Sequence, residues 1–152
     1  MGRRSTPTTS GSCGLPTNAD LLLDTSAAVA LVAPSVETHA AVMARTRGAT
    51  LGLAGHAAFE TYSVLTRLPG ALRLNAAGAR SVIETNFPAS VFLTPSQSAR
   101  ALAALAEAGI AGGAVYDGLV ALAAATANIV LLSCDRRALP TYAALSVRVE
   151  ML

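Results

Sequence analysis

Four acidic residues stand in stretches of sequence that are otherwise apolar or built from small residues. They are Asp24 in LLLDTS, Glu60 in AAFETY, Asp117 in VYDGL and Asp135 in LLSCD, out of nine acids in the chain. Carboxylates that gather in one place repel each other, and burial penalises their charged forms further. Such a cluster is expected only where a cation fills it, and oxygen ligands without a Cys or His set favour Mg²⁺ or Mn²⁺. A metal held in this way can activate water for phosphodiester hydrolysis.

The surrounding sequence predicts an α/β fold, because apolar strand-like runs alternate with helix-like segments. Helices flanking a parallel sheet cover both of its faces, which explains strands that are almost continuously apolar. We expect a single sheet of about five parallel strands, at 21–24, 50–54, 90–94, 129–133 and 146–152. Helices are predicted at 27–32, 35–47, 56–68, 75–87, 95–109 and 112–128, with Thr25 or Ser26 as the cap of the first.

This order of elements brings the four acids to one edge of the predicted sheet. Ligands of parallel sheets bind at the carboxyl ends of the strands. Asp24 ends the first strand, and Asp135 follows the strand at 129–133. Glu60 and Asp117 lie early in helices that begin at the same edge, so the sequence predicts one acidic site.

Each acid also has a purely structural explanation. Asp24 could be a helix cap, Asp117 a partner of a helix dipole and Asp135 a turn residue. Glu60 could be a solvated helix residue, although its aromatic neighbours in FETY argue against this interpretation.

Composition limits the class of protein. The chain has 152 residues, enough for one domain with a real core, and 53% of them are hydrophobic. A mean hydropathy of +0.51 raises the question of a membrane protein. The apolar tract between 117 and 135 is interrupted by Thr126, Asn128 and Ser133, however, so a helix, a turn at Asn128 and a buried strand are predicted there, with no membrane span.

Charge and cysteine usage favour a cytoplasmic protein without a strongly basic surface. All 11 basic residues are Arg, and the net charge of +2 is too small for strong non-specific nucleic-acid binding. The two cysteines, Cys13 and Cys134, form no recognisable pattern, which is typical of a reducing compartment. Residues 1–19 lack an apolar run, so we predict a disordered extension rather than a secretion signal.

Weaker signals surround the four acids. His56 lies four residues before Glu60 and could share its helix face, as a metal ligand, a base or simply a packed residue. Arg136 and Arg137 follow Asp135 directly and could contact an RNA backbone or form a solvated turn. Arg67 could reach a phosphate or pair with an acid.

Four segments, in order, resemble the PIN-domain ribonucleases, and among them the VapC-type toxins of bacterial toxin–antitoxin pairs. The segments are LLLDTSAAVALV, AAFETYSVLTRL, VYDGLVALAAATAN and IVLLSCDRRAL, which together extend from residue 21 to about 140. The resemblance implies a three-layer α/β/α PIN-like domain, here residues 20–152, with metal-dependent endoribonuclease activity. The long segment before the first strand departs from the family, in which that strand begins almost at the first residue.

The same resemblance assigns roles to individual residues and implies partners. The four acids match the catalytic, metal-binding positions of the family: Asp24, Glu60, Asp117 and Asp135. Ser26 and Ser133 match positions whose hydroxyl orients metal-bound water or a carboxylate. The expected partners are RNA, a small VapB-like antitoxin that brings an Arg near the acids, and a second copy of the chain in a homodimer.

Other functions stay open at this point. A catalytically inactive PIN-like scaffold and a DNA nuclease of the same fold are compatible with the same residues. A phosphoacceptor receiver domain is disfavoured because the chain contains no Lys, and a haloacid-dehalogenase-like phosphatase would need D-x-D where this chain has D-T-S.

Overall fold

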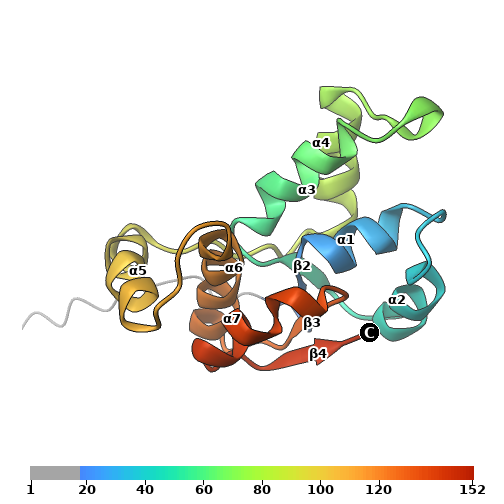
Figure 1. Cartoon of the computed structure of the whole chain (residues 1–152). Coiled ribbons are helices and arrows are strands. Elements are labelled where there is room, and N and C mark those ends of the chain that lie inside the picture. Colours follow the sequence, from blue (N-terminus) through green and yellow to red (C-terminus); the bar gives the residue numbers. More distant parts are fainter. Residues whose placement is uncertain (1–17) are drawn as a thin grey trace, which may run out of the picture.

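The computed structural model describes residues 18–152. Nearly all of the predicted N-terminal extension, 1–19, therefore lies outside the described residues, as does Cys13. Within the described part, helices surround a small parallel sheet (Figure 1). None of the helices between residues 18 and 152 combines the length and apolar character that crossing a bilayer requires.

The sheet has four parallel strands in the order β2-β1-β3-β4. Their bounds are β1 (Leu21–Leu23), β2 (Leu51–Leu53), β3 (Leu131–Ser133) and β4 (Val149–Met151). Because β1 pairs with both β2 and β3, the ends of these three strands lie together, as the site prediction requires.

The prediction of about five strands is wrong by one, because the segment 90–94 forms only an isolated bridge between Ala54 and Val91. Its backbone does follow β2: the amides of Ala89 and Val91 donate to the carbonyls of Leu51 and Leu53. Val91 and Leu93 pack against the core, while Phe92 is more than half exposed, and the pairing stops at this single bridge.

Seven α-helices connect and cover the described strands: α1 (Thr25–Val32), α2 (His39–Thr46), α3 (Ala57–Leu65), α4 (Ala76–Asn86), α5 (Pro95–Glu107), α6 (Ala114–Ala127) and α7 (Leu139–Ala144). Two 3₁₀ turns, η1 (Gly70–Leu72) and η2 (Arg136–Ala138), complete the described elements. The first six helices were predicted to within a few residues, whereas α7 and both 3₁₀ turns were not.

Local signals explain most helix ends. α4 begins with Asn75 as cap, α5 with a Thr94–Gln97 capping box followed by Pro95, and α6 ends at Asn128 in the left-handed conformation. The predicted cap of the first helix is wrong. Asp24 occupies that position, with its side chain accepting the amide of Ala27, so Thr25 and Ser26 are already helical.

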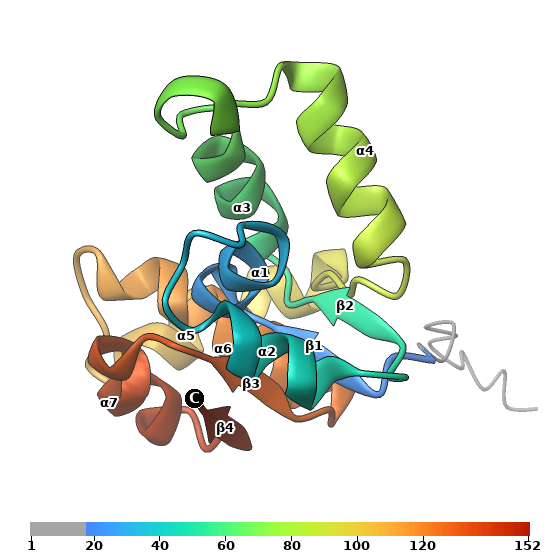
Figure 2. The same cartoon turned by 90° about the vertical axis from the view of Figure 1, so that its right-hand side faces the viewer.

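The core has two halves, one on each face of the sheet. Successive side chains of a strand point to opposite faces. Leu22 accordingly packs in a cluster with residues of α6 and α7, while Leu21 and Leu23 pack with residues of α1 and α2. This arrangement is the predicted α/β/α sandwich, and the two views show helices on both sides of the strands (Figures 1 and 2).

The helices α3 and α4 lie side by side and extend beyond the sheet (Figures 1 and 2). α3 packs against α1. Because Glu60 lies in the first turn of α3, this packing places it near the end of β1.

Gly52 in β2 lies directly against the backbone of Ala89, and replacing it tests the pairing of β2 with the segment 89–91. A Cβ at this position would lie 2.2 Å from the carbonyl oxygen of Ala89. We therefore expect Gly52→Ala to lower the free energy of unfolding by about 1–3 kcal/mol through overpacking, as measured by urea denaturation.

Gly113→Ala is the matched control, because nothing lies within 4 Å of its added Cβ and its φ of −62° suits any residue. Equal stability of the two variants would contradict the close approach of β2 to Ala89.

Candidate active site

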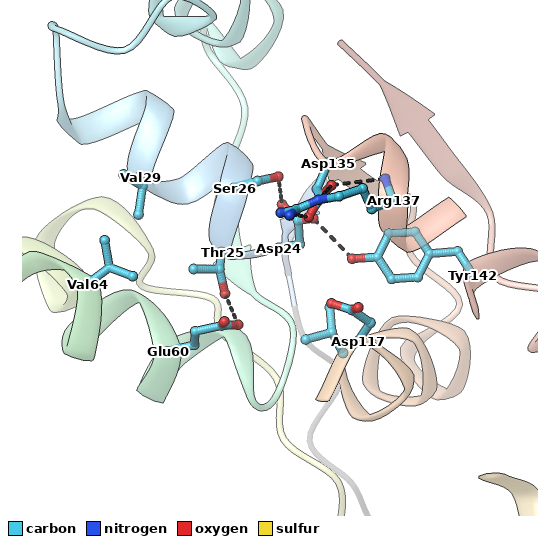
Figure 3. A pocket seen from close by; sticks show the side chains of 11 residues that line it. Asp24, Thr25, Ser26, Val29, Glu60, Val64, Asp117, Asp135, Arg137 and Tyr142 are labelled. Carbon is cyan, nitrogen blue, oxygen red and sulfur yellow. Dashed lines mark hydrogen bonds and ion pairs between the residues drawn. The ribbon is translucent and has the colours of Figure 1, made fainter. Parts of the chain in front are cut away.

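The four predicted acids line one pocket of about 280 Å³ at the carboxyl ends of β1 and β3 (Figure 3). Ser26, Thr25, Arg137 and Tyr142 share its wall. Asp24 comes from the end of β1, Glu60 from the first turn of α3, Asp117 from the first turn of α6 and Asp135 from the residue before η2. The structure thus brings all four acids together, as the strand order predicts.

Asp24 is the buried anchor of this pocket, with 4% of its surface exposed. Its Oδ1 accepts hydrogen bonds from Ser26 Oγ at 2.7 Å and from the backbone amide of Ala27 at 2.9 Å. Its Oδ2 accepts from Ser133 Oγ and from the hydroxyl of Tyr142, the latter at 3.0 Å. Desolvation raises the pKa of Asp24 above its ordinary value, and these hydrogen bonds act in the opposite direction.

Ser26 and Ser133 are themselves fixed by the backbone. The amide of Cys134 donates to Ser26 Oγ at 2.8 Å, and the amide of Asp135 donates to Ser133 Oγ at 3.1 Å. Each hydroxyl can therefore direct its proton toward the Asp24 carboxylate. Both serines donate to the Asp24 carboxylate, and the roles in a metal site that the resemblance implies for them stay predictions.

Glu60 is exposed and accepts a hydrogen bond from Thr25 Oγ1 at 2.6 Å (Figure 3). The aromatic neighbours of Glu60 do not bury it, because Phe59 and Tyr62 are 64% and 38% exposed. That part of the sequence argument is wrong. Glu60 reaches the pocket because it lies in the first turn of α3 beside the start of α1.

Asp117 differs from the other three acids, since its carboxylate accepts no hydrogen bond from any residue in 18–152. Partial burial raises its pKa, and the negative charges of Glu60, Asp135 and Asp24 raise it further, against a smaller effect of Arg137. Its two carboxylate oxygens are therefore the atoms of the pocket most readily available to bind a metal ion.

Asp135 is neutralised by a neighbour in sequence. Arg137 donates to both carboxylate oxygens, from Nε and Nη2 at 3.0 Å each, and its backbone amide donates at 2.9 Å. The hydrogen bonds from the Arg137 side chain lower the pKa of Asp135. Arg137 is thus the cation at the mouth of the pocket, while Arg136 points into solvent as an exposed residue that does not line it.

The remaining weak signals lie outside the acidic pocket. His56 precedes α3 and stacks on Tyr116, with ring centroids 5.0 Å apart, which supports its interpretation as a packed residue. Arg67 donates to the carbonyl of Ser63 at 3.1 Å. Cys134 is a half-buried free thiol.

Sequence reasoning missed two hydroxyls of the pocket: that of Thr25, which donates to Glu60, and that of Tyr142, which donates to Asp24 beside the two serines. Tyr142 belongs to α7, a helix that was not predicted at all. Its signal was present in Pro140 near a helix start and in the apolar spacing of Leu139, Tyr142 and Leu145.

The oxygen atoms that line the pocket are of the chemical type that a hard divalent cation prefers as ligands. They are carboxylate and hydroxyl oxygens, and Asp117 carries an electrostatic penalty that a cation would relieve. Within residues 18–152, however, no three acidic, His or Cys side chains are already grouped closely enough to form a metal site. The carboxylates would have to close around the ion.

Comparison with known proteins decides the family. Residues 21–145 match the PIN domain. The chain is 43% identical to the ribonuclease VapC27 of Mycobacterium tuberculosis over 129 residues, which cover 85% of this chain and 94% of that protein. It is 42% identical to the ribonuclease VapC40 of the same species, over 85% of this chain and 96% of the relative. The chain belongs to the PIN-domain family, in the group of the VapC ribonucleases.

Solved structures show the same fold at lower sequence identity. The structure of FitAB bound to an IR36 DNA fragment aligns with a TM-score of 0.64 at 16% identity, covering 86% of this chain and 94% of that chain. VapC20 of M. tuberculosis, a toxin that cleaves the sarcin–ricin loop, aligns with a TM-score of 0.57 at 16% identity, covering 76% and 89%. The PIN fold predicted from the four segments is confirmed.

The charge repulsion in this PIN-domain pocket predicts how Asp117→Asn changes stability. The pKa of Asp117 is raised by folding, so its contribution to stability is complete below about pH 4 and is lost as pH rises through the folded-state pKa. At pH 7 in EDTA, we expect Asp117→Asn to be as stable as the wild type or more stable, and at pH 4 the difference should shrink. Urea denaturation at both pH values measures this.

Glu107→Gln provides the control, because Glu107 is an exposed acid at the end of α5 that does not line the pocket. A large loss of stability in Asp117→Asn at pH 7 would contradict the repulsion.

Proposed function

We propose that this protein is a metal-dependent endoribonuclease that hydrolyses RNA phosphodiester bonds, as the toxin of a type II toxin–antitoxin pair. The observation that carries the proposal is the single pocket lined by Asp24, Glu60, Asp117 and Asp135. The names of the relatives, ribonucleases of the VapC group, favour RNA as substrate.

The same four carboxylates would hold Mg²⁺ or Mn²⁺ in this proposal, with Asp117 offering oxygens to which no residue of 18–152 donates a hydrogen bond. The ion would supply a Lewis acid and a lowered pKa of the attacking water. Ser26 and Ser133 keep the Asp24 carboxylate in one orientation, which limits the reorganisation that accompanies binding.

Arg137 would act on the substrate side of the site. Its side chain is 92% exposed although it pairs with Asp135, so this ion pair is cheap to break. A guanidinium suits a phosphate as well as a carboxylate. We infer that a phosphate of the RNA backbone competes with Asp135 for Arg137 and is thereby drawn to the pocket.

The proposed antitoxin would use a different surface of the protein. A groove of about 420 Å³ lies between α3 and α4, with lining residues that include Ala58, Phe59 and Ile83. Almost all of its surface is apolar, which fits the apolar face of a short helix. A homodimer, which the resemblance to the family implies, and a cytoplasmic location, which the cysteine usage favours, complete the proposal.

Cleavage assays on purified protein test the activity. Asp117→Asn should abolish Mg²⁺-dependent cleavage of total RNA, because the amide removes one charge from the proposed metal site without disturbing a hydrogen bond. Glu107→Gln should cleave like the wild type. Mapping the fragment ends identifies the bond that is cut.

Two results would contradict the proposal in different ways. Wild-type cleavage by Asp117→Asn would remove this acid from the site, and absence of Mg²⁺-dependent cleavage in the wild type would favour a binding or scaffold protein. Cleavage of single- or double-stranded DNA with RNA left intact would favour the DNA nuclease.

Growth experiments test the toxin. Induction of the wild type should arrest bacterial growth within a few generations, and Asp117→Asn at equal protein level should not, because the arrest requires hydrolysis. Co-expression of a small antitoxin encoded next to the gene should restore growth, and that antitoxin should co-purify with the chain. Arrest by Asp117→Asn as strong as by the wild type would show that toxicity is not nucleolytic.

A further inference from the structure

Tyr142 contributes a buried hydroxyl to the acidic pocket. The residue lies in α7 with 1% of its surface exposed, and it lines the pocket beside Asp24. Its hydroxyl donates to Asp24 Oδ2 at 3.0 Å, across 118 positions of sequence (Figure 3). α7 packs on α6, so the ring is held by the core on one side and faces the carboxylate with its polar end.

The hydrogen bonds of Asp24 fill its capacity as an acceptor. An ionised carboxylate offers about four lone-pair positions. Oδ1 accepts hydrogen bonds from Ser26 Oγ and the amide of Ala27. Oδ2 accepts hydrogen bonds from Ser133 Oγ and the hydroxyl of Tyr142. A cation that bonds to Asp24 in this pocket must therefore take the place of one donor.

Three of the four donors are tied to the backbone. The amide of Ala27 is the capping contact of α1, and the hydroxyls of Ser26 and Ser133 each accept a backbone amide near the end of β3. No backbone amide in the described part of the chain donates to the hydroxyl of Tyr142. Tyr142 is the donor that can be released at least cost.

We propose that Tyr142 is a positioning residue that occupies the pocket side of Asp24 Oδ2 and yields it to the divalent cation. This proposal rests on the proposed function, because it assumes that Asp24 helps to hold a metal ion. Tyr142 and the cation then compete for one oxygen. When no ion is bound, Tyr142 donates a hydrogen bond to the buried Asp24 carboxylate. Because the ion must displace this hydrogen bond, Tyr142 lowers the affinity of the pocket for the ion.

Tyr142→Phe separates these two effects, because it removes the hydroxyl and keeps the ring in the core. The metal-free variant should melt at a lower temperature than the wild type, since a buried carboxylate loses a donor. It should nevertheless bind Mn²⁺ roughly three- to tenfold more tightly, as the competitor is gone. Calorimetric titration of the full chain with Mn²⁺ at pH 7, together with thermal melts with and without Mn²⁺, gives both quantities.

Tyr62→Phe is the matched control, because Tyr62 lies outside the acidic pocket on α3 and loses the same hydroxyl. It should leave Mn²⁺ affinity unchanged. A purely structural role of Tyr142 predicts a lower melting temperature with unchanged or weaker Mn²⁺ binding, and that result would overturn the proposal.

Asp117→Asn distinguishes failure of this proposal from failure of the proposed function. If Asp117→Asn binds Mn²⁺ as the wild type does, the proposed metal site is wrong, and the proposed competition between Tyr142 and the cation is wrong as well. If Asp117→Asn loses Mn²⁺ binding while Tyr142→Phe equals the wild type, only the role of Tyr142 is wrong.

A measurement on the wild type covers the case in which Tyr142→Phe does not fold. In protein labelled with ¹³C-tyrosine, Mg²⁺ should shift the ring resonances of Tyr142 and leave those of Tyr62 in place. The chain has three tyrosines, so Tyr62→Phe and Tyr116→Phe assign the signals by elimination. Unmoved Tyr142 resonances at saturating Mg²⁺ would overturn the proposal.

Discussion

The burial of the Asp24 carboxylate is the constraint on which the pocket depends. A charge at 4% exposure is costly unless donors replace the lost water, and here four donors come from three separate segments. The start of α1, the end of β3 and α7 must each be in place to satisfy it. The pairing of β1 with β3 brings Ser133 within hydrogen-bond distance of Asp24. The hydrogen bonding of this buried carboxylate therefore depends on the strand order of the sheet.

Charge balance in the pocket is incomplete, which is unusual for a structural cluster. Three further carboxylates surround Asp24, and Arg137 is the only basic side chain of the described residues that lines the pocket with them. Partial burial raises the pKa of Asp117 most, and repulsion by the other three carboxylates raises it further. Such uncompensated repulsion costs stability, and clustered groups with shifted pKa values are typical of functional sites, which is why the proposed function starts from this pocket.

The sequence was sufficient to predict what depends on parallel topology. Asp24 and Asp135 follow apolar strands, so their meeting at one edge needed only the rule for strand ends. Contacts that close over long separations were not predictable in this way. Tyr142 reaches Asp24 across 118 positions from a helix of six residues, and the apolar spacing of that helix does not indicate which segment it packs against. The segment 90–94 has a strand-like composition, but its exposed Phe92 and single bridge show that tertiary packing decides whether such a run becomes a strand.

The four carboxylates differ in how freely their side chains can move, because they differ in the number of hydrogen bonds that hold them. Asp24 is fixed by the caps and hydroxyls around it, and Asp135 is held by a residue two positions away on the same turn. Glu60 and Asp117 lie on separate helices, α3 and α6. Within residues 18–152, the Glu60 carboxylate accepts one hydrogen bond, from Thr25, and the Asp117 carboxylate accepts none. A cation would therefore find one rigid carboxylate and two adjustable ones. Closure of the site then requires rotation of side chains at the first turns of two helices, while the sheet that carries Asp24 stays as it is.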